Sequence, residues 1–505
     1  MKHLTILCLV ALCLFSSPCA RAQTTPSADQ KLDAMITKGM ADWKIPGLAA
    51  VVVKDGQVVF QKTYGVKNLE TKAPVDENTL FNMGSTTKAV ICIALGMLVD
   101  QGKLHWEDKV RKHLPYFQLS DPYLTEEARV QDLLTHNLGI DQADLLWTVD
   151  SVSTEETLAR FRFAEKAYPA RGGFIYNNLM YAVAGEVIKA VSGQHWTTFV
   201  QEHIFKPLEM THTVAKAADL FKGGNYVTPY VDDIEDGLVT ANYNLSDQIG
   251  AAGMIWSCAE DISHYLTFLV NGGGYKSDTL LKPSTFRYLF EPHAFVNKES
   301  FYPTQSLTRP NWITYGLGWF QTDYRGEKLD FHTGSIAGLI AIAGIMHDKK
   351  TAVYVFSNLD HAELRHAILY KAMDLYAFGD DSRDWHREIF DLYSGFRRQA
   401  ADAMKKQEAA RAPNTKPTLD LKAYAGTYEH DMLGKAEVTV MNDHLSVNFN
   451  HFLSLQAFHW HYDTFRSDKH NRYKERFMLN FNLNQQGTVE EMAVFGERFK
   501  KAPQK

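Results

Sequence analysis

The chain has 505 residues, of which 53 are basic and 59 acidic, so its formal net charge is −6 at pH 7. Apolar residues make up 45% of the chain and charged residues 22%, which excludes a mainly disordered or fibrous protein. The acidic balance also argues against a protein that binds nucleic acid through its charge. The length alone predicts roughly two to four domains.

The first 22 residues have the pattern of a secretory signal peptide. Lys2 precedes a short apolar run at 4–15, and Ala20-Arg21-Ala22 has the pattern of a cleavage site. The run is shorter than the roughly 20 residues that cross a bilayer, and no later apolar run reaches that length. We therefore expect a signal peptide at 1–22, a periplasmic or secreted mature protein, and no integral membrane segment after cleavage.

Residues 29–378 combine predicted strands near both ends with a helical middle. Helical periodicity begins at Lys31, two β-rich runs flank Asp55-Gly56 as in a hairpin, and an apolar stretch from Ser85 to Gln101 predicts a buried helix. Further helices are predicted at 179–191, 259–271 and 362–376, and further strands at 315–323, 329–332, 339–347 and 351–357. Strands that bracket a helical insertion predict an α+β, or mixed α/β, fold.

The composition changes near residue 379. A charged segment at 380–411 has helical periodicity, and two prolines break that pattern within 411–417. Short strand-like runs follow at 436–441, 445–450, 476–481 and 489–495. We therefore expect a main domain at 29–378, a helical linker at 379–415 and a small C-terminal β domain at 416–501.

Cysteines and histidines form no clear metal motif, and we predict no metal site. Three of the five cysteines lie in the predicted signal peptide. The other two, Cys92 and Cys258, lie in apolar sequence that favours buried free thiols, although an oxidising compartment would permit a disulfide between them. His459 and His461 alternate along one predicted strand without further ligands, and His366 is expected at the surface.

Ser85 and Lys88 have the spacing that nucleophilic catalysis needs. A serine hydroxyl reacts when a nearby base takes its proton and fixed N–H groups stabilise the negative charge that develops on the substrate. Residues three apart share one face of a helix, so the Lys88 amine can reach the Ser85 hydroxyl. Lys88 is the only lysine with a serine three residues before it. The alternative is a polar first helical turn with Ser85 as its cap.

Sequence blocks around these two residues, and further blocks in the same order, resemble those of a known superfamily. The blocks are Pro46-Gly47-Leu48, Tyr64-Gly65-Val66, Met83-Gly84-Ser85-Thr86-Thr87-Lys88, Asp132-Leu133-Leu134-Thr135-His136, Tyr176-Asn177-Asn178, Ala252-Gly253-Met254, Tyr315-Gly316-Leu317-Gly318-Trp319 and His332-Thr333-Gly334-Ser335. The chain therefore resembles the serine beta-lactamase and penicillin-binding-protein superfamily, in the branch of class C beta-lactamases, D-aminopeptidases and related esterases. This resemblance implies a beta-lactamase/transpeptidase-like fold, with an antiparallel sheet flanked by helices and a helical lobe.

The resemblance also implies roles for the residues of the first two motifs. Ser85 would be the acylated nucleophile, and Lys88 would assist its deprotonation. Tyr176 would hydrogen-bond the nucleophile and relay protons, and Asn178 would hold Lys88 and the substrate amide. Whether Lys88 or Tyr176 is the general base stays open, because two such groups placed close together share a proton.

The third motif departs from the usual pattern of the superfamily. The resemblance implies that substrate lies along His332, Thr333, Gly334 and Ser335, and that the backbone N–H groups of Ser85 and Ser335 form the oxyanion hole. Position 332 carries histidine where the lactamases and many penicillin-binding proteins have a lysine that helps to hold a substrate carboxylate. Because histidine titrates near neutrality, we expect weaker and pH-dependent anion binding, which disfavours efficient beta-lactamase activity.

These observations predict an exported serine hydrolase that forms an acyl-Ser85 intermediate without a metal or organic cofactor. Its substrate would be a short peptide or amide, with D-residues as one option, or a small ester. Two alternatives stay open: a sensor or binding protein that cell-wall fragments acylate with little turnover, and a true beta-lactamase. The segment from 416 resembles the lipocalin-like β module often attached to such hydrolases. No feature of the sequence indicates its role or the oligomeric state.

Overall fold

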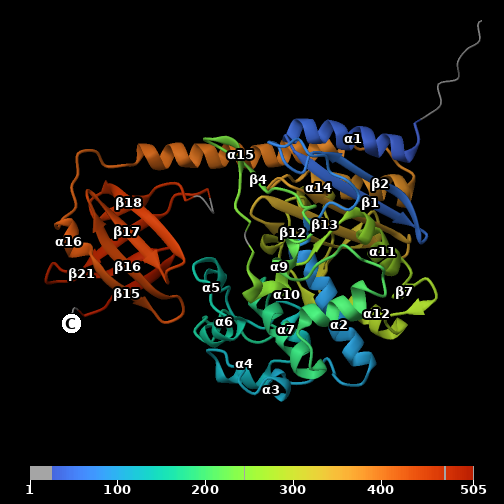
Figure 1. Cartoon of the computed structure of the whole chain (residues 1–505), viewed down its shortest axis with the longest axis horizontal. Helices are drawn as coiled ribbons and strands as arrows, with labels where there is room; N and C mark the ends of the chain where they lie inside the picture. The colour runs from blue at the N-terminus through green and yellow to red at the C-terminus, as the bar shows by residue number, and fades with distance from the viewer. Residues whose placement is uncertain (1–25, 244, 471–473, 504–505) are drawn as a thin grey trace, which may run out of the picture.

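The computed structural model describes residues 26–243, 245–470 and 474–503 (Figure 1). The predicted signal peptide lies outside the described residues. The described residues form a large body built on one sheet, a long helix that leads away from it, and a smaller barrel at the far end of that helix (Figure 1). No helix among them is long and apolar enough to cross a bilayer.

Within the described ranges, the body is organised around an eight-stranded antiparallel sheet. Its strands lie in the order β2 Gln57–Gly65, β1 Gly47–Lys54, β14 Thr351–Ser357, β13 Leu339–Met346, β12 Glu327–Ile336, β11 Phe320–Tyr324, β10 Ile313–Tyr315 and β9 Ala294–Phe295. The predicted N-terminal hairpin is confirmed, because β1 and β2 join at Asp55 and Gly56, both with positive φ. On its other side β1 pairs with β14, where Val51 lies opposite Tyr354, so the sheet unites strands from both ends of the domain.

Helices cover both faces of this sheet. Side chains alternate along β1, so Val52 packs into one apolar core and the adjacent Val51 into the other. The first core lies under α1 Ala28–Trp43 and α14 Leu364–Ala372, and the second under α11 Ala259–Val270. Because neither face meets water, β13 and β14 are buried along their whole length and have continuous apolar sequences.

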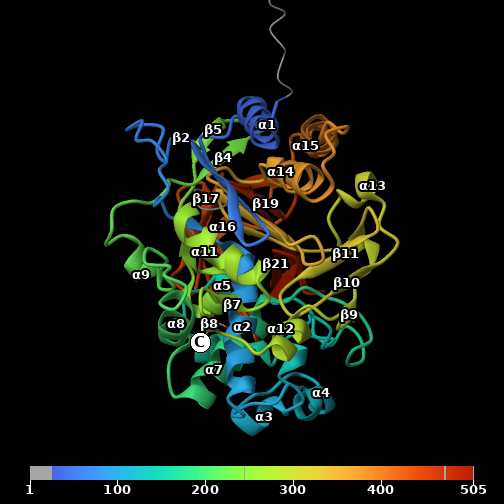
Figure 2. The ribbon, with the colours of Figure 1, turned by 90° about the vertical axis from the view of Figure 1, so that its right-hand side faces the viewer.

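The middle of the chain folds into a helical lobe, and α2 Thr87–Asp100 runs down the centre of this lobe (Figure 2). α2 is buried over almost its whole length because its sequence is apolar on every side. It follows a 3-10 turn at Gly84–Thr86, so the helix predicted from Ser85 begins at Thr87. The other helices of the body are α3 Val110–His113, α4 Pro122–Glu127, α5 Leu145–Thr148, α6 Thr154–Phe161, α7 Asn178–Ser192, α8 Trp196–Val200, α9 Ala217–Leu220, α10 Gly250–Gly253, α12 Pro283–Leu289 and α13 Gln305–Thr308. Short strand pairs are β3 Phe81–Asn82 with β6 Trp256–Ser257, β4 Tyr230–Asp233 with β5 Gly237–Thr240, and β7 Gly274–Tyr275 with β8 Asp278–Thr279.

The strand predicted at 315–323 is in fact two strands. β10 ends at Tyr315 and β11 begins at Phe320. Gly318, in the turn between them, has φ 81°, and a Cβ there would lie 3.0 Å from the backbone nitrogen of Ala89. The turn is therefore shaped by its close approach to α2, a contact that strand periodicity does not reveal.

α15 Trp385–Ala409 carries the chain from the body to the barrel (Figure 1). Before it, the helix predicted at 362–376 is α14 followed by a π-helix, Met373–Phe378. After α15 and the short α16 Leu421–Tyr424, the described residues form a closed antiparallel barrel of eight strands. These are β15 Gly426–His430, β16 Gly434–Met441, β17 His444–Phe449, β18 Leu453–His461, β19 Thr464–Ser467, β20 Met478–Leu483, β21 Val489–Val494 and β22 Glu497–Lys501.

The barrel interior is a packed apolar core. Tyr428, Phe465 and Phe481 are buried, and the Phe481 ring makes edge-on contacts with the other two rings. Closure leaves no strand edge unpaired, which allows a domain of this size to be stable beside the body. The expected C-terminal β domain is thus a barrel filled by its own side chains.

The β4–β5 hairpin of the body contacts both α15 and the barrel. Lys469 of the barrel pairs with the carboxylates of Asp233 at 2.5 Å, Glu235 at 3.1 Å and Asp236 at 2.7 Å. Arg397 of α15 pairs with Asp232 at 2.8 Å. Opposite charges therefore hold the barrel against the body at this hairpin.

Candidate active site

Ser85 lies where the turn before α2 meets β12, and two glycines permit this approach. A Cβ on Gly334 would lie 1.9 Å from the Met83 carbonyl oxygen, and a Cβ on Gly84 would lie 2.5 Å from the Ser335 nitrogen. The backbones of the two segments can therefore approach this closely only without these side chains. The Ser85 turn therefore packs against Ser335, and Ser85 itself stays partly exposed.

Lys88 is fully buried and contacts Ser85 as its spacing predicts. Its Nζ donates hydrogen bonds to Ser85 Oγ at 3.1 Å, to Asn178 Oδ1 at 2.8 Å and to the Ala252 carbonyl oxygen at 2.8 Å. Burial lowers the pKa of Lys88 to about 7, although the negative charge of Asp144 opposes this shift. Near neutral pH a large share of Lys88 is therefore an uncharged amine that can accept a proton.

Tyr176 reaches the same site from a distant part of the chain. The centre of its ring is 4.8 Å from Lys88 Nζ. Its hydroxyl is buried and forms no hydrogen bond with any described residue. Ser85 nevertheless lies close enough to lower the pKa of this hydroxyl. Burial outweighs that effect and raises the pKa of Tyr176 well above its usual value, so Tyr176 is a neutral phenol.

Neighbouring side chains fix the position of Tyr176. Its ring lies parallel to that of Phe320, with ring centres 6.5 Å apart, and 4.3 Å from the ring of His136. Its carbonyl oxygen accepts a hydrogen bond from Gln142 Nε2 at 2.8 Å, and the next residue, Asn177, donates its N–H to His136 Nδ1 at 3.0 Å. His136 therefore helps to hold the segment Tyr176-Asn177-Asn178 in place.

Asn178, the first residue of α7, connects Lys88 to an acid that sequence reasoning missed. Its Nδ2 donates to both carboxylate oxygens of Asp144, at 3.2 Å to Oδ1 and 3.1 Å to Oδ2. Trp147 Nε1 also donates to Asp144 Oδ1, at 3.0 Å. Asp144 is partly exposed just before α5, and no motif marks it. Only the folding of the lobe brings it to the site.

His332 in β12 is buried and does not behave as expected from its sequence. Its Nδ1 lies 2.6 Å from the Thr333 carbonyl oxygen and its Nε2 lies 3.0 Å from the Tyr315 hydroxyl, so Nδ1 carries the proton and Nε2 accepts. Burial, helped by the nearby charge of Lys88, lowers the pKa of His332 to about 3. The expected pH-dependent anion binding near neutrality is therefore wrong, because the ring stays neutral there.

Ser335 is the exposed member of the third motif. Thr333 is nearly buried, with Oγ1 2.8 Å from the Tyr302 hydroxyl. Ser335 Oγ accepts a hydrogen bond from Arg365 Nη1 at 2.9 Å. The guanidinium of Arg365 also donates to both carboxylate oxygens of Glu363, each at 2.9 Å, so its charge is balanced within the protein.

Cys92 and Cys258 are buried free thiols, as expected. The described residues contain one group that could hold a metal ion, His212, Cys258 and Asp261, with ligand atoms within 4.8 Å of one another. The Asp261 carboxylate already accepts hydrogen bonds from the N–H groups of His212 and Thr213 and from the Thr213 hydroxyl. Burial raises the pKa of the Cys258 thiol, which disfavours the thiolate that binds metals. We therefore assign no metal to this group.

The other histidines considered from the sequence have structural contacts. His459 Nε2 lies 3.0 Å from the Tyr462 carbonyl oxygen, and His461 Nδ1 accepts a hydrogen bond from the Ala412 N–H at 3.2 Å. The expectation of a surface position for His366 is wrong, because this residue is fully buried in α14. Its side chain packs among aromatic rings between helix and sheet.

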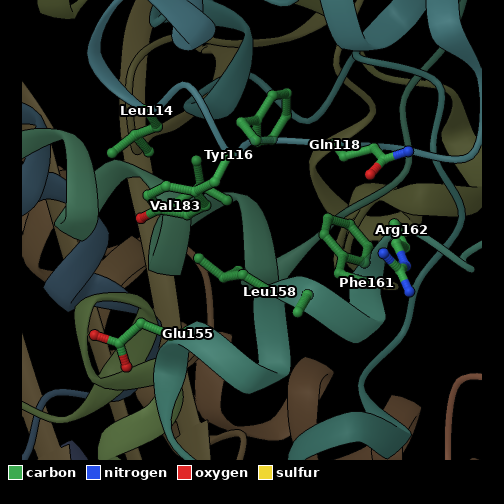
Figure 3. A pocket seen from close by; sticks show the side chains of 10 residues that line it. Leu114, Tyr116, Gln118, Glu155, Leu158, Phe161, Arg162 and Val183 are labelled. Carbon is green, nitrogen blue, oxygen red and sulfur yellow. The ribbon is translucent and has the colours of Figure 1, made fainter.

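A separate pocket of about 220 Å³ lies in the helical lobe (Figure 3). Its walls are mostly apolar and come from the loop after α3, from α6 and from α7, as Figure 3 shows for Leu114, Phe161 and Val183. None of the residues around Ser85 lines it. We therefore do not connect this pocket with the chemistry at Ser85.

Comparisons with known proteins agree with this architecture. The sequence model of the family described as Beta-lactamase matches residues 32–378, and that of a Domain of unknown function (DUF3471) matches residues 410–504. The unguisins hydrolase ungD of Aspergillus violaceofuscus is 27% identical over 447 residues, which cover 82% of this chain and 76% of that protein. Protein flp of Staphylococcus aureus is 25% identical over 341 residues, which cover 66% of this chain and 64% of that protein.

Solved structures share the fold. The octameric penicillin-binding protein homologue from Pyrococcus abyssi is 23% identical, with a TM-score of 0.63, and the match covers 93% of this chain and 98% of that one. SurE is 17% identical, with a TM-score of 0.57, and the match covers 94% of this chain and 99% of that one. These likenesses confirm the expected beta-lactamase/transpeptidase-like fold.

Proposed function

The chain belongs to the beta-lactamase family, and we propose that it hydrolyses a small ester, or a short peptide or amide, through an acyl-Ser85 intermediate. The observation that carries this proposal is the 3.1 Å hydrogen bond between Lys88 Nζ and Ser85 Oγ, at a site where burial lowers the Lys88 pKa to about 7. A serine becomes nucleophilic when a base with a pKa near the working pH lies beside it. The named hydrolase among the relatives supports hydrolysis as the reaction.

In the acylation step, the uncharged amine of Lys88 accepts the proton of the Ser85 hydroxyl while Oγ forms a bond to the substrate carbonyl carbon. The backbone N–H groups of Ser85 and Ser335 would stabilise the negative charge on the carbonyl oxygen. The bond to the leaving group then breaks, and the leaving group takes the proton from Lys88, with Tyr176 placed to relay it. We assign the role of base to Lys88 because its pKa is lowered while that of Tyr176 is raised.

In the deacylation step, a water molecule attacks the carbonyl carbon of acyl-Ser85. Lys88 takes one proton of the water while the hydroxyl group joins the acyl carbon. The bond between that carbon and Ser85 Oγ then breaks, and Lys88 returns the proton to Oγ as the acid product leaves. The net reaction consumes one water for each acyl group released. If water attacked slowly, acyl-Ser85 would accumulate, and the protein would act as a sensor that cell-wall fragments acylate with little turnover.

The charges near Ser85 favour uncharged or cationic substrates over substrates that need their carboxylate bound. His332 stays neutral, and Arg365 is paired with Glu363, so neither offers a free positive charge. We therefore propose short peptides or amides, including those with D-residues, and small esters as substrates. A beta-lactam that relies on its carboxylate would react slowly.

We also propose that the mature protein is periplasmic or secreted. This proposal is supported by the pattern of Lys2, the apolar run at 4–15 and Ala20-Arg21-Ala22. N-terminal sequencing of the exported protein should find Gln23 as its first residue. Mature protein that keeps Met1 and stays inside the cell would contradict the proposal.

A panel assay on one purified batch tests the proposed reaction. The panel contains small esters, D- and L-aminoacyl amides and a chromogenic beta-lactam, and the proteins are the wild type, Ser85→Ala and the control Ser306→Ala. Ser306 is exposed on α13, and its hydroxyl contacts the Pro303 carbonyl oxygen. We expect Ser85→Ala to lose turnover by a factor on the order of a thousand or more, and Ser306→Ala to keep it.

The same assay separates the alternatives. Turnover that survives in Ser85→Ala would contradict the proposal. A burst of one equivalent of leaving group without steady-state turnover would favour the sensor. Beta-lactam hydrolysis faster than that of every ester and amide would favour a beta-lactamase.

A further inference from the structure

Asp144 has a carboxylate whose hydrogen-bonding capacity is not used up by the protein. An ionised carboxylate can accept roughly four hydrogen bonds. Asp144 Oδ1 accepts from Trp147 Nε1 and Asn178 Nδ2, whereas the hydrogen bond at Oδ2 comes from Asn178 Nδ2 at 3.1 Å. Both donors are uncharged, and in the part of the chain that the structure describes no cationic side chain forms an ion pair with Asp144. The residue is also partly exposed.

The other charged groups around Ser85 are neutralised. Lys88 loses its charge as the pH rises above about 7, and His332 is neutral because its pKa is about 3. Arg365, which contacts Ser335, has its charge balanced by Glu363. Above pH 7, where most of Lys88 is uncharged, the site therefore presents a negative charge to an incoming substrate. Such a charge attracts cations and repels carboxylates.

A short chain of hydrogen bonds connects Asp144 to the reacting serine. One side chain, Asn178, separates it from Lys88, which in turn donates to Ser85 Oγ. The carboxylate is close enough to Lys88 for its negative charge to act on the Lys88 pKa. It borders the site through Asn178, the residue that the family resemblance places beside the substrate amide.

We propose that Asp144 binds a protonated amine carried by the acyl part of the substrate, so that the enzyme prefers aminoacyl esters and amides with a free amino group. This inference rests on the acyl-Ser85 chemistry proposed above and adds the substrate class. The competing view is that Asp144 is only a positioning residue that orients Asn178.

The test compares two esters of the same alcohol that differ only in the amino group. Benzyl esters of D- and L-alanine carry the ammonium, and benzyl propionate has hydrogen in its place. The proteins are the wild type, Asp144→Asn and the control Asp141→Asn. Asp141 is an exposed acid of the same loop, and its side chain accepts a hydrogen bond from the Gln142 N–H at 2.7 Å. In Asp144→Asn the new amide side chain can still accept from Trp147 but has no charge.

We expect wild-type kcat/KM to favour the better alanine ester over the propionate by roughly tenfold or more, the size expected for a charge-assisted hydrogen bond. Asp144→Asn should reduce this preference by roughly tenfold relative to the wild type, whereas Asp141→Asn should keep it. Asp144 also raises the Lys88 pKa, and the variant removes that influence. This change affects both esters equally, so the ratio of the two kcat/KM values is the diagnostic quantity.

A second measurement needs no variant. In the wild type, alaninamide should slow the labelling of Ser85 by a serine-reactive probe at a lower concentration than propionamide does. Equal losses on both esters in Asp144→Asn, or equal protection by the two amides, would overturn the amine site and leave Asp144 as a positioning residue. Ester hydrolysis that does not depend on Ser85 would instead overturn the proposed function, and the amine inference with it.

Discussion

Replacing Lys88 with Met should remove a pH dependence of stability as well as the base. In the folded chain the Lys88 pKa is lowered from 10.5 to about 7 by burial. Between these values the unfolded chain binds a proton at Lys88 that the folded chain has released. The free energy of unfolding therefore rises with pH, by about 1.4 kcal/mol for each pH unit. From pH 7 to pH 9.5 the wild type should gain about 3 kcal/mol that Lys88→Met cannot gain.

Urea unfolding of both proteins at several pH values between 7 and 9.5 measures this difference. Lys38→Met is the control, because Lys38 is largely exposed on α1 and pairs with Asp42. The difference in unfolding free energy between the wild type and Lys88→Met should change with pH, whereas the difference for the control should not. A constant difference for Lys88→Met would refute the view that burial holds Lys88 partly uncharged at neutral pH.

Gly334→Ala would place Cβ 1.9 Å from the Met83 carbonyl oxygen, so we expect a loss of about 2 kcal/mol or more of stability and a loss of Ser85 labelling. The control Gly223→Ala, where the added Cβ meets nothing within 4 Å, should be unchanged in both assays. Burial raises the pKa of Asp330 to about 6, so the stability that the protonated Asp330 contributes is present at acid pH and is lost as the pH rises from about 4 to about 6. Asp330→Asn should not show this loss and should be more stable than the wild type at pH 7 by up to about 3 kcal/mol. An unchanged melting temperature of Asp330→Asn at pH 7 would contradict this. Lys469→Ala removes the cation that Asp233, Glu235 and Asp236 share and leaves, among the described residues, only Arg476, which pairs with Glu235, so we expect about 1 kcal/mol of lost stability and faster proteolysis at 410–417. An unchanged cleavage rate would show that the Lys469 pairing does not hold the barrel to the body.

The part of the site that the sequence predicts best is the part formed by local geometry. Ser85 and Lys88 are three residues apart, and helical spacing alone places the amine against the hydroxyl. Tyr176 and Asn178 could be assigned through the family motif, because their approach to Lys88 depends on how two distant segments pack. The β1–β2 hairpin was likewise predictable, since Asp55-Gly56 has the backbone freedom that a tight turn needs.

The environment of each group could not be predicted. Histidine at position 332 suggests titration near neutrality, but its pKa depends on burial and on the charge of Lys88, which arise only in the fold. Asp144 lies 34 residues before Asn178 in the chain, and no spacing rule connects them. In the barrel, β18 changes register between His459 and His461, which obscures the alternation that marks a strand.

Acylation of Ser85 Oγ is the step on which the proposed reaction depends most directly. A serine-reactive fluorophosphonate should label the wild type once, and mass spectrometry of a tryptic digest should place the label on peptide 73–88, whose one serine is Ser85. The labelling rate should rise as the pH passes through about 7, where Lys88 loses its proton. A label on any other serine, or equal labelling of Ser85→Ala, would contradict the account.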